Sequence, residues 1–512
     1  MQNIYGDTRV LDSKVRELYK LSEDIMMENA AAALEDAVLS SLEKSLKDCR
    51  AVCLARPAVL ILAGSGNNGA DGYALARRLM RHEYAVTVCA VSEPKSQMCV
   101  LQKERASAIG VSFIDISEYD DYIERISIDL KVIVDCIFGS GFHGELPYEA
   151  QAVIASANKN CDAVRIACDV PSGLDGLGNV ANSGSASAIC FCADKTVTMG
   201  ALKMSLYSDI AKDACGEIVL ANLGVSRGNF EYADGTVKYE AQLLEKSDAK
   251  LPHRKVQNVN KGSFGHAAIV CGSKSGAAVI AASAALRFGA GLVSLVTGSK
   301  NFECATNVPF ELMVSPSFPA NTTAAALGMG LGSDGKQFVD WLGENPNVPA
   351  VLDADICHSP FIKELLEKRK GFVLTPHPKE FALLLEQCGI GIFSVKEVVT
   401  RRVELVKAFC NKYPDVVLLL KGANVLIGIK RATQNEVALY INPYGCNALA
   451  KGGSGDVLSG LVAALLAQKY EPLQAAVYAS LAHTFAAQKA LEAVKNDFAL
   501  TPLDLIQALQ SI

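Results

Sequence analysis

Short apolar segments alternate with amphipathic segments along most of the chain. A stretch at 72–83 has helical periodicity and lies between two nearly continuous apolar runs. Such runs are typical of parallel strands that helices cover on both faces. The β-α-β order predicts a doubly wound sheet. The predicted strands of the first half are 58–64, 85–91, 131–138 and 163–170.

The alternation stops in a polar, irregular stretch at 228–262 and then resumes. We therefore predict two α/β domains, at residues 1–228 and 232–512. The strands predicted for the second domain are 266–272, 291–297, 350–355, 371–377 and 415–422. Its predicted helices are 277–288, 379–387, 395–412, 455–468 and 472–494.

Composition excludes several classes of protein. The 512 residues are 50% hydrophobic and 20% charged, with a net charge of −6 and no basic block, so we expect no nucleic-acid partner. No apolar run reaches the roughly 18 residues of a spanning helix, and the polar N-terminus lacks a signal-peptide core, so we expect no membrane partner. The 16 cysteines are scattered through mostly apolar segments without a C-x-x-C pair, which fits buried thiols in a reducing cytoplasm.

The segment "LAGSGNNGADGYALARRL" (62–79) joins a predicted strand to a predicted helix through a loop rich in glycine and asparagine. Its glycines at 64, 66 and 69 give the spacing G-x-G-x-x-G of dinucleotide-binding loops. A dehydrogenase would usually add an acid at the end of the second strand, and Glu93 is only a loose match. The motif by itself is therefore weak evidence for NAD.

Two further strand ends carry oxygen ligands. Asp135 stands in "VDCIFGSGFHGEL" (134–146), and Asp169 and Ser172 stand in "CDVPSGLDGLG" (168–178). In a doubly wound sheet these ends meet at the edge where ligands bind, so Asn, Asp and Ser oxygens there would suit a hard monovalent cation. Taken singly, Asp169 is better explained as a helix cap, and Ser172 as an ordinary turn residue.

Together these motifs resemble the NAD(P)H-hydrate epimerase family, from "MMENAAAAL" (26–34) to "ADKTVTMGALKMSL" (193–206). The resemblance implies a Rossmann-like three-layer domain and a potassium ion held by Asn68, Asp135 and Ser172. It implies that Asp169 binds substrate and works as acid or base. The loop departs from the family at Ala70, whose methyl group would crowd the ligand or restrict φ. The implied substrate-binding residues are Asn67, Asn68, Gly69, Ala70, Asp71, Gly139, Ser140, Gly141, Phe142, His143, Gly144, Glu145 and Asp169.

A glycine turn, "ALAKGGSGDVLSG" (448–460), precedes the first long helix of the second half. Glycines let a backbone approach a phosphate, and a helix N-terminus attracts the phosphate charge. Asp456 at this helix start is either a simple cap or a group with its own chemical task, because an anion beside a phosphate is otherwise unfavourable.

The second half resembles the ribokinase-like fold, and more closely its ADP/ATP-dependent NAD(P)H-hydrate dehydratase branch. The ordered motifs are "KGSFGHAAIVCGSKSGAAVIAASAALRFGAGLVSL" (261–295), "GMGLG" (328–332), "LDADICH" (352–358), "LTPHPKEFALL" (374–384), "LLLKGANVLI" (418–427) and the glycine turn. The resemblance makes Asp456 the base that deprotonates the acceptor hydroxyl. The implied hydrate-binding residues are Ala277, Gly330, His377 and Asp456, and the nucleotide-binding residues are Lys421, Gly422, Ala423, Asn424, Val425 and Gly455.

Several details of the second half stay open at this point. His377 in "TPHP" is a binding residue or a structural strand-end histidine, and Glu380 is a helix-start acid or a Mg²⁺ ligand through water. Asn260 stands where the family has histidine, and Lys451 where it tends to have threonine.

We expect a cytoplasmic, homo-oligomeric repair enzyme of two activities. The first epimerises R and S hydrates of NADH and NADPH with K⁺, and the second dehydrates the S hydrate with ADP or ATP and Mg²⁺. Two alternatives remain. The second half is a small-molecule kinase, or the first half is a nucleotide-binding module without catalysis. Product analysis separates a kinase from a dehydratase, and epimer equilibration tests the first half.

Overall fold

A computed structural model of the chain describes residues 1–48, 56–82, 84–160, 162–181, 188–231, 236–298, 308–332 and 335–512. The chain forms two compact units, one of Asn3–Glu240 and one of Met1–Gln2 with Ala241–Ile512. The division lies inside the polar stretch 228–262, and residues 232–235, the expected start of the second domain, lie outside the described residues. Within these ranges, no helix is both long and apolar enough to cross a membrane.

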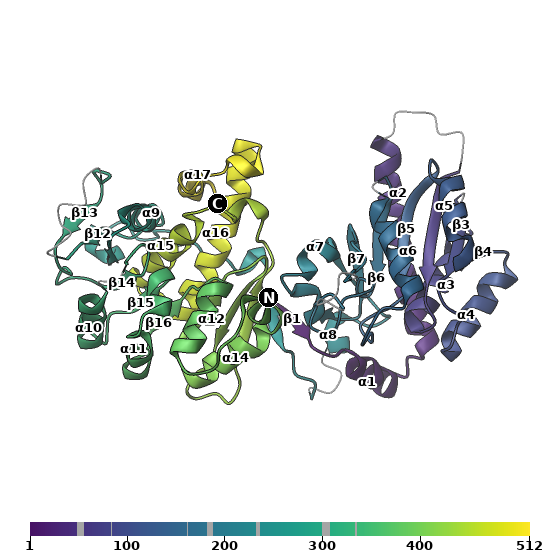
Figure 1. The fold of residues 1–512 in the computed structure, drawn as a ribbon, viewed down its shortest axis with the longest axis horizontal. Helices are drawn as coiled ribbons and strands as arrows, with labels where there is room; N and C mark the ends of the chain where they lie inside the picture. Colours follow the sequence, from purple (N-terminus) through teal and green to yellow (C-terminus); the bar gives the residue numbers. More distant parts are fainter. Residues whose placement is uncertain are drawn as a thin grey trace. The chain divides into compact units, whose positions relative to one another are not determined.

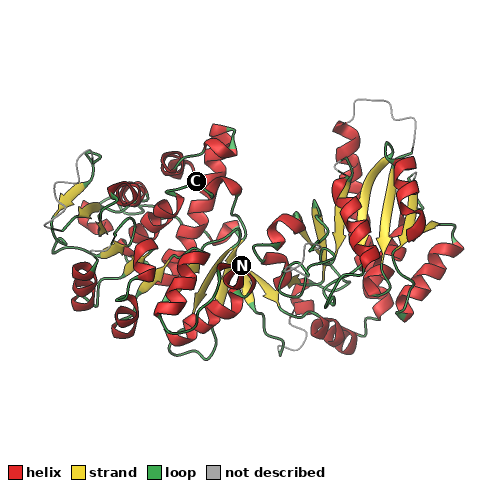
Figure 2. Ribbon diagram, viewed as in Figure 1, coloured by secondary structure: helices red, strands yellow, loops and turns green. Residues whose placement is uncertain are grey.

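The N-terminal unit has a seven-stranded sheet in the order β4-β3-β2-β5-β6-β7-β9, in which every pairing is parallel. Figure 1 labels most of its elements and Figure 2 separates its strands from its helices. The strands are β2 (Ala58–Ala63), β3 (Ala85–Ala90), β4 (Ser112–Asp115), β5 (Leu130–Cys136), β6 (Val164–Cys168), β7 (Lys195–Met199) and β9 (Glu217–Ala221). Outside this sheet, β1 (Gln2–Tyr5) pairs in parallel with β8 (Leu202–Lys203).

Helices cover both faces of this sheet and make three layers. One apolar core joins α2, α3 and α4 to the strands, and a second joins α5 and α6 to the opposite face. The helices are α1 (Arg9–Tyr19), α2 (Glu23–Asp48), α3 (Asn67–Leu79), α4 (Gln97–Ala108), α5 (Tyr119–Ile126), α6 (Tyr148–Lys159), α7 (Ala211–Cys215) and α8 (Arg227–Glu231).

The C-terminal unit has a longer sheet. From β13 the order is β13-β12-β11-β14-β15-β16-β17-β18-β19-β10, parallel as far as β17 and antiparallel through the β17-β18-β19 meander. The strands are β10 (Ala241–Leu243), β11 (His266–Val270), β12 (Leu292–Val296), β13 (Met313–Ser315), β14 (Ala324–Leu327), β15 (Ala350–Leu352), β16 (Phe372–Leu374), β17 (Val417–Leu420), β18 (Val425–Ile429) and β19 (Ala438–Asn442).

One face of this sheet is packed by an alanine-rich core of α9, α15, α16 and α17. Helices α9 and α15 approach closely because Gly460 has no side chain, and a Cβ there would lie 2.2 Å from Ala281 O. The helices are α9 (Ser275–Arg287), α10 (Lys336–Glu344), α11 (Ile362–Lys368), α12 (Pro378–Gln387), α13 (Val395–Thr400), α14 (Arg402–Lys412), α15 (Ser454–Ala467), α16 (Pro472–Val494) and α17 (Pro502–Ala508).

The predicted α/β class with parallel sheets is confirmed in both units. Two element predictions were wrong in detail. Helix α3 begins at Asn67 and not at 72, because Gly66 is extended (φ −100°, ψ −162°) and starts the helix directly after the strand turn. The helix predicted over 395–412 is two helices, separated at Arg401, whose φ of −113° and ψ of 22° are not helical.

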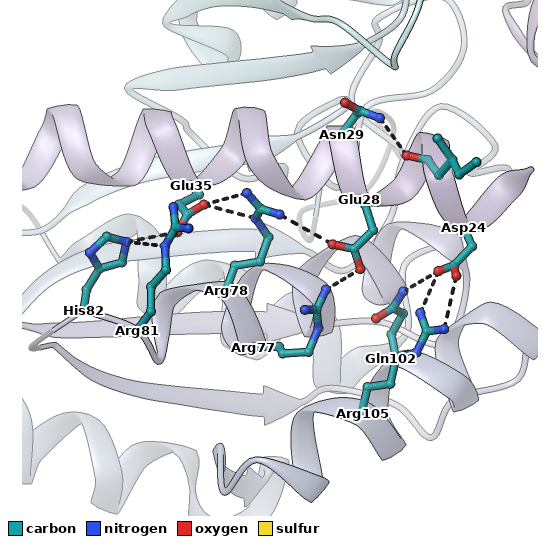
Figure 3. Close-up of polar contacts among 11 residues, drawn as sticks. Asp24, Glu28, Asn29, Glu35, Arg77, Arg78, Arg81, His82, Gln102 and Arg105 are labelled. Carbon is teal, nitrogen blue, oxygen red and sulfur yellow. Dashed lines mark hydrogen bonds and ion pairs between the residues drawn. The ribbon is translucent and has the colours of Figure 1, made fainter. Parts of the chain in front are cut away.

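A chain of ion pairs holds α2 against α3 and α4 (Figure 3). The buried Glu35 carboxylate lies 2.9 Å from Arg78 Nη2 and 3.0 Å from both Arg81 Nε and His82 Nε2. Glu28 pairs with Arg77 and Arg78, and Asp24 lies 2.6 Å from Arg105 Nη1. The last turn of α3 is thereby held against α2.

Removing the Glu35 charge tests this network. Burial raises the pKa of Glu35, but hydrogen bonds from His82 and Arg78 outweigh it and leave the pKa below its usual 4.5. Its contribution is therefore complete above pH 4.5 and is lost as pH falls through the lower folded-state value. We expect Glu35→Gln to destabilise the unit by about 3 kcal/mol at pH 7, and Glu28→Gln by less than about 1 kcal/mol.

The measurement is amide hydrogen exchange in α3. The difference in protection between the wild type and Glu35→Gln should become smaller in acid. Equal protection of α3 in both variants at pH 7 would contradict the assigned network.

Candidate active sites

The N-terminal unit contains a cavity of about 860 Å³ at the carboxyl edge of its sheet. Its wall combines α1, the first turns of α2 and α3, the loop after β5, Asp169 just after β6, the last residues of β7 and β8, and Leu223 after β9. This is the edge at which ligands bind in doubly wound sheets. The cavity is lined by, among others, Arg9, Asp12, Arg16, Glu23, Asn67, Asn68, Asp71, Gly139, Ser140, Gly141, Phe142, His143, Glu145, Asp169 and Lys203.

The predicted loop Asn67 to Asp71 is the first turn of α3. Glycine is required at position 69, because a Cβ there would lie 2.0 Å from Gly64 O. Asn67 donates from Nδ2 to Glu23 Oε1 at 2.5 Å. Within the described residues, the buried Nδ2 of Asn68 has no hydrogen-bond partner. A free amide at a helix N-terminus on the cavity wall suits an anionic or carbonyl oxygen of a ligand.

Not every predicted binding residue reaches the cavity. In the part of the chain that the structure describes, Gly69, Ala70 and Gly144 do not line it. The Ala70 side chain is buried in the core beneath α3, and its φ is not positive, so its methyl group neither crowds the cavity nor restricts the backbone as anticipated.

Asp169 is held in a left-handed conformation, with φ of 68°, at the end of β6. Its carboxylate lies 2.7 Å from Lys203 Nζ and accepts bonds from Ser140 N at 3.0 Å and Met199 N at 3.2 Å. Burial alone would raise the pKa of Asp169, but the Lys203 charge and these bonds lower it below its usual value. Asp169 is therefore ionised at neutral pH.

Two neighbouring carboxyl groups on the cavity wall behave in the opposite way. Asp71 is buried beside the negative charge of Asp169, and burial, with that charge, raises its pKa well above the usual value. Burial also raises the pKa of Asp12 to about 6, against the attraction of Lys203. One carboxylate beside a carboxylic acid is the pairing that proton transfer to and from a substrate needs.

Asp135 and Ser172 meet beneath this edge. Ser172 donates to Asp135 from its hydroxyl and from its amide, both at 2.7 Å, and the Ile137 amide donates at 3.1 Å. Among the described residues no lysine or arginine pairs with this fully buried carboxylate, and burial raises its pKa to about 6. Asn68 Oδ1 lies beside Gly139, where an added Cβ would be 3.1 Å from it.

In the C-terminal unit, the carboxyl ends of β15, β16 and β17 bring together Asp353, Glu380 and Lys421. Lys421 Nζ lies 2.9 Å from Asp353 Oδ1 and 3.6 Å from Glu380 Oε2. Ser459 of α15 donates to the other Asp353 oxygen at 2.7 Å. Burial lowers the pKa of Lys421, but the charges of Asp353 and Glu380 outweigh it and raise the pKa. Lys421 is a fixed positive charge.

The glycine turn lies against this lysine. Gly453 has a φ of 91°, which favours glycine, and a Cβ on Gly455 would lie 3.2 Å from Lys421 Nζ. Asp456 follows in the first turn of α15. Burial and the negative charge of Asp353 raise the pKa of Asp456 to about 7, in spite of Lys421. A half-buried carboxyl group that titrates near neutrality is suited to accept a proton.

The remaining predicted residues of the C-terminal unit lie in the β17-β18 turn and near the start of α9. Lys421 to Val425 form the turn of the β17-β18 hairpin, in which Gly422 and Ala423 are exposed and Asn424 is buried. On the other side, Lys274 N donates to Gly330 O at 3.0 Å, beside the start of α9, where Ala277 lies.

His377 begins α12. Its Nδ1 accepts from Glu380 N at 3.2 Å, and its own amide donates to Glu380 Oε2 at 2.8 Å, which is a capping box. Glu380 is therefore a helix-start acid, one of the two roles that the sequence left open for it, and His377 has the structural role of a helix cap. Its role in binding stays a prediction.

The two departures of the second half have local partners. Asn260 caps a short 3₁₀ turn by accepting from Gly262 N at 2.9 Å. Lys451 donates to Phe498 O at 2.7 Å.

Comparison with known proteins covers both units. A family model described as YjeF-related protein N-terminus matches residues 23–205, and one described as NAD(P)H-hydrate dehydratase matches residues 267–511. A Helicobacter pylori protein named bifunctional NAD(P)H-hydrate repair enzyme Nnr is 43% identical over 515 residues, covering 100% of both chains. A Coxiella burnetii protein of the same name is 33% identical, covering 85% of this chain and 86% of the relative.

The chain belongs to the family of bifunctional NAD(P)H-hydrate repair enzymes. A solved ADP/ATP-dependent NAD(P)H-hydrate dehydratase from Bacillus subtilis is 26% identical, with a TM-score of 0.44, over 53% of this chain and 97% of that one.

Sequence reasoning missed some members of both sites. Lys203 stands in the epimerase-like motif 193–206, and Asp353 stands inside the predicted strand 350–355 and the motif 352–358, so both carried a positional signal without an assigned role. Asp12 had no such signal in the sequence. It reaches the cavity from α1, a helix that the hydrophobic pattern did not predict. Ion pairs between distant segments have no local sequence signature.

The Asp169–Lys203 pair permits a test that depends on stability alone. Both side chains are nearly buried, so Lys203→Met leaves an uncompensated charge and is expected to cost about 3 kcal/mol. Adding Asp169→Asn removes that charge and should recover part of the loss. The control is Lys195→Met, whose partner Glu217 is exposed, with an expected cost below about 1 kcal/mol.

Hydrogen exchange of the slowest amides in β6 and β7 gives the three free energies. A double variant no more stable than Lys203→Met would contradict the coupling of the two charges.

Proposed function

We propose that the N-terminal unit interconverts the R and S hydrates of NADH and NADPH. We further propose that the C-terminal unit dehydrates the S hydrate with ADP or ATP. Family membership supports the pair of activities, and the separate carboxyl clusters of the two units support two reactions on one chain. The two activities complement each other, because epimerisation supplies the one epimer that dehydration consumes.

The observation that carries the dehydratase assignment is the pKa of Asp456, near 7, beside the positive charge of Lys421. Asp456 takes the proton of the C6 hydroxyl while that oxygen attacks the terminal phosphorus of the nucleotide. The amides of the glycine turn and Lys421 attract the phosphate oxygens. Elimination of phosphate from C6 then regenerates the nicotinamide ring, because phosphate leaves far more readily than hydroxide.

Residues of the first unit divide the epimerisation between them. Ionised Asp169 accepts or returns a proton, and Asp71, whose pKa is raised by burial and by the charge of Asp169, serves as the acid. Asn67 and Asn68 at the start of α3 and the loop Gly139 to Glu145 bind the hydrated nucleotide. Arg9 and Arg16 on the cavity wall supply positive charge for its phosphates.

Two cations complete the proposal. Potassium suits the fully buried Asp135, whose hydrogen bonds in the described residues come from the neutral donors of Ser172 and Ile137, with Asn68 as a further oxygen ligand. It would neutralise a buried charge beneath the binding edge. Magnesium would accompany the nucleotide phosphates and meet Glu380 through water, where it supplies further positive charge.

We also place the enzyme in the cytoplasm as a homo-oligomer. The described cysteines are free thiols, as expected for a reducing compartment.

One experiment tests the dehydratase assignment and its base. Mixed hydrates are incubated with and without ADP, and the nicotinamide absorbance and the released phosphate are followed. We expect NAD(P)H and inorganic phosphate from the wild type, whereas a kinase would leave a phosphorylated acceptor. Asp456→Asn should slow dehydration by about 10²–10⁴ because an amide cannot accept the proton.

The pH profile sharpens this test. Only ionised Asp456 accepts a proton, so the wild-type rate should rise with pH through about 7 and then level off. In Asp456→Asn that rise should vanish from the residual rate. A rate within threefold of wild type in the variant would exclude Asp456 as the base.

Glycine substitutions test the epimerase assignment. A Cβ at Gly139 would lie 3.1 Å from Asn68 Oδ1 and 3.2 Å from Asp169 Oδ2, so Gly139→Ala must displace both groups. We expect equilibration of pure R hydrate to slow by about tenfold or more. Gly176→Ala is the matched control, because nothing lies within 4 Å of its added Cβ. Equal slowing in both variants would contradict the placement of Asn68 and Asp169.

A further inference from the structure

A second cavity, of about 670 Å³, lies at the amino edge of the sheet in the C-terminal unit. Its wall includes Pro349 and Gly371, which directly precede β15 and β16, and Asp415, which lies two residues before β17. Asp353 and Lys421 follow the opposite ends of β15 and β17, so the cavity is separate from the proposed dehydratase site. Its volume is within the range of about 300–1,000 Å³ that is typical of small-molecule sites.

Three basic side chains from distant segments meet on the wall of this cavity. Arg369 follows α11, Arg431 lies just after β18, and Lys469 lies just after α15. Within the described residues, none of the three forms an ion pair. Two carboxylates, Asp415 and Glu471, also line the wall, so the positive charges outnumber the negative ones.

Arg369 is a buried cation that its neighbours hold in one orientation. Only 5% of the residue is exposed. Its Nη1 donates to Leu342 O at 2.8 Å and to Asn345 O at 3.0 Å, and its Nη2 donates to Val348 O at 2.6 Å. Its Cζ lies 4.4 Å from the centre of the Phe372 ring, in a cation–π contact. The guanidinium group is therefore fixed before any ligand arrives.

These contacts leave the charge of Arg369 without a counter-ion in the part of the chain that the structure describes. Nε donates to Lys370 O at 3.4 Å, so Nε, Nη1 and Nη2 use four N–H groups and one N–H of Nη2 has no acceptor. Burial lowers the pKa of Arg369 to about 10, and no carboxylate opposes this effect. A buried cation and a buried free N–H both destabilise a fold, and an anion in the cavity would compensate for both.

Two residues of the wall adopt a backbone conformation that favours glycine. Lys469 has a φ of 69° and Asp415 a φ of 63°. Of the described residues other than glycine, six have a positive φ, and Asp169 in the cavity of the N-terminal unit is another of them. Such strained residues are concentrated at binding sites. The Asp415 carboxylate accepts from Ala432 N at 3.2 Å, which occupies one of its oxygens.

The rest of the wall offers flat apolar surfaces. Tyr470 is partly exposed, and its ring packs edge-on against Tyr478, with 6.1 Å between the ring centres. Pro346, Pro349 and Pro472 also line the cavity. A planar ring of a ligand can pack against such side chains.

We propose that this cavity binds a phosphorylated metabolite of nucleotide size. Its phosphate lies among Arg369, Arg431 and Lys469, and its ring packs against Tyr470 and the neighbouring prolines. A phosphate suits the site because a fixed guanidinium presents its N–H groups in the geometry of phosphate oxygens. Phosphate and ring together account for both the charged and the apolar parts of the wall.

The full-length protein, titrated with AMP as the probe and followed by hydrogen exchange with mass spectrometry, tests this site without any activity assay. We expect AMP to slow exchange in residues 369–372 and 466–472. AMP at the proposed dehydratase site would instead slow exchange in residues 421–425 and 453–456, so the two events are separate. Adenosine and inorganic phosphate should each bind at the cavity at least about tenfold more weakly than AMP, because each lacks one half of the contacts.

Variants at the cavity test the role of its charges. Lys469→Asn and Arg431→Gln should each weaken AMP binding at residues 369–372 and 466–472 by about tenfold, the usual effect of losing one charged hydrogen bond. Asparagine tolerates the left-handed backbone of Lys469. Lys495→Asn is the matched control, because Lys495 also follows a helix with a φ of 64° but does not line the cavity. It should bind AMP as the wild type does.

Three results would overturn the proposal. The first is unchanged exchange of residues 369–372 and 466–472 in the wild type with AMP. The second is binding of adenosine or inorganic phosphate there as tightly as AMP. The third is an affinity for AMP in Lys469→Asn and Arg431→Gln equal to that of Lys495→Asn. None of these results depends on the proposed epimerase and dehydratase activities.

Discussion

In each unit, one lysine forms an ion pair with a buried aspartate that follows a parallel strand. This ion pair influences the pKa values of the neighbouring carboxyl groups. Lys203 lies 2.7 Å from Asp169, and Lys421 lies 2.9 Å from Asp353. Within the described residues, the neighbouring Asp71 and Asp456 form no direct ion pair. Burial and the paired aspartate together raise their pKa values. A single cation thus produces two carboxyl groups with different proton affinities.

The sheets determine where these groups meet. Parallel strands deliver all their carboxyl ends to one edge, so residues far apart in sequence converge there without long loops. Glycines line the turns at this edge in both units. At Gly64, Gly69 and Gly453 the backbone approaches neighbouring atoms so closely that a side chain would not fit. The ion pairs between α2 and α3 hold the last turn of α3 in place (Figure 3), and the hydrogen bond from Asn67 to Glu23 holds its first turn.

The sequence predicted β2 and β5, because continuous apolar runs bounded by glycine identify buried parallel strands. It did not predict β4, β7, β9, β14, β18 or β19. It also located Asp169 and Asp456, since both follow a recognisable strand end or glycine turn. It did not show that Asn67 lies inside a helix, because two asparagines and two glycines disfavour helix until Gly66 caps the turn. Lys203 and Asp12 acquire their role only from contacts across the fold.

The proton affinity of Asp456 reflects a balance that the nucleotide itself would alter. Burial raises the pKa of Asp456 most, Asp353 and Glu380 raise it further, and Lys421 lowers it, with a result of about 7. A lower value would weaken the base, and a higher one would leave it protonated at neutral pH. Phosphates arriving beside Lys421 add negative charge and raise the proton affinity further. Under the proposed function, a magnesium ion bound with the phosphates would offset this charge, which favours binding the nucleotide and the metal ion together.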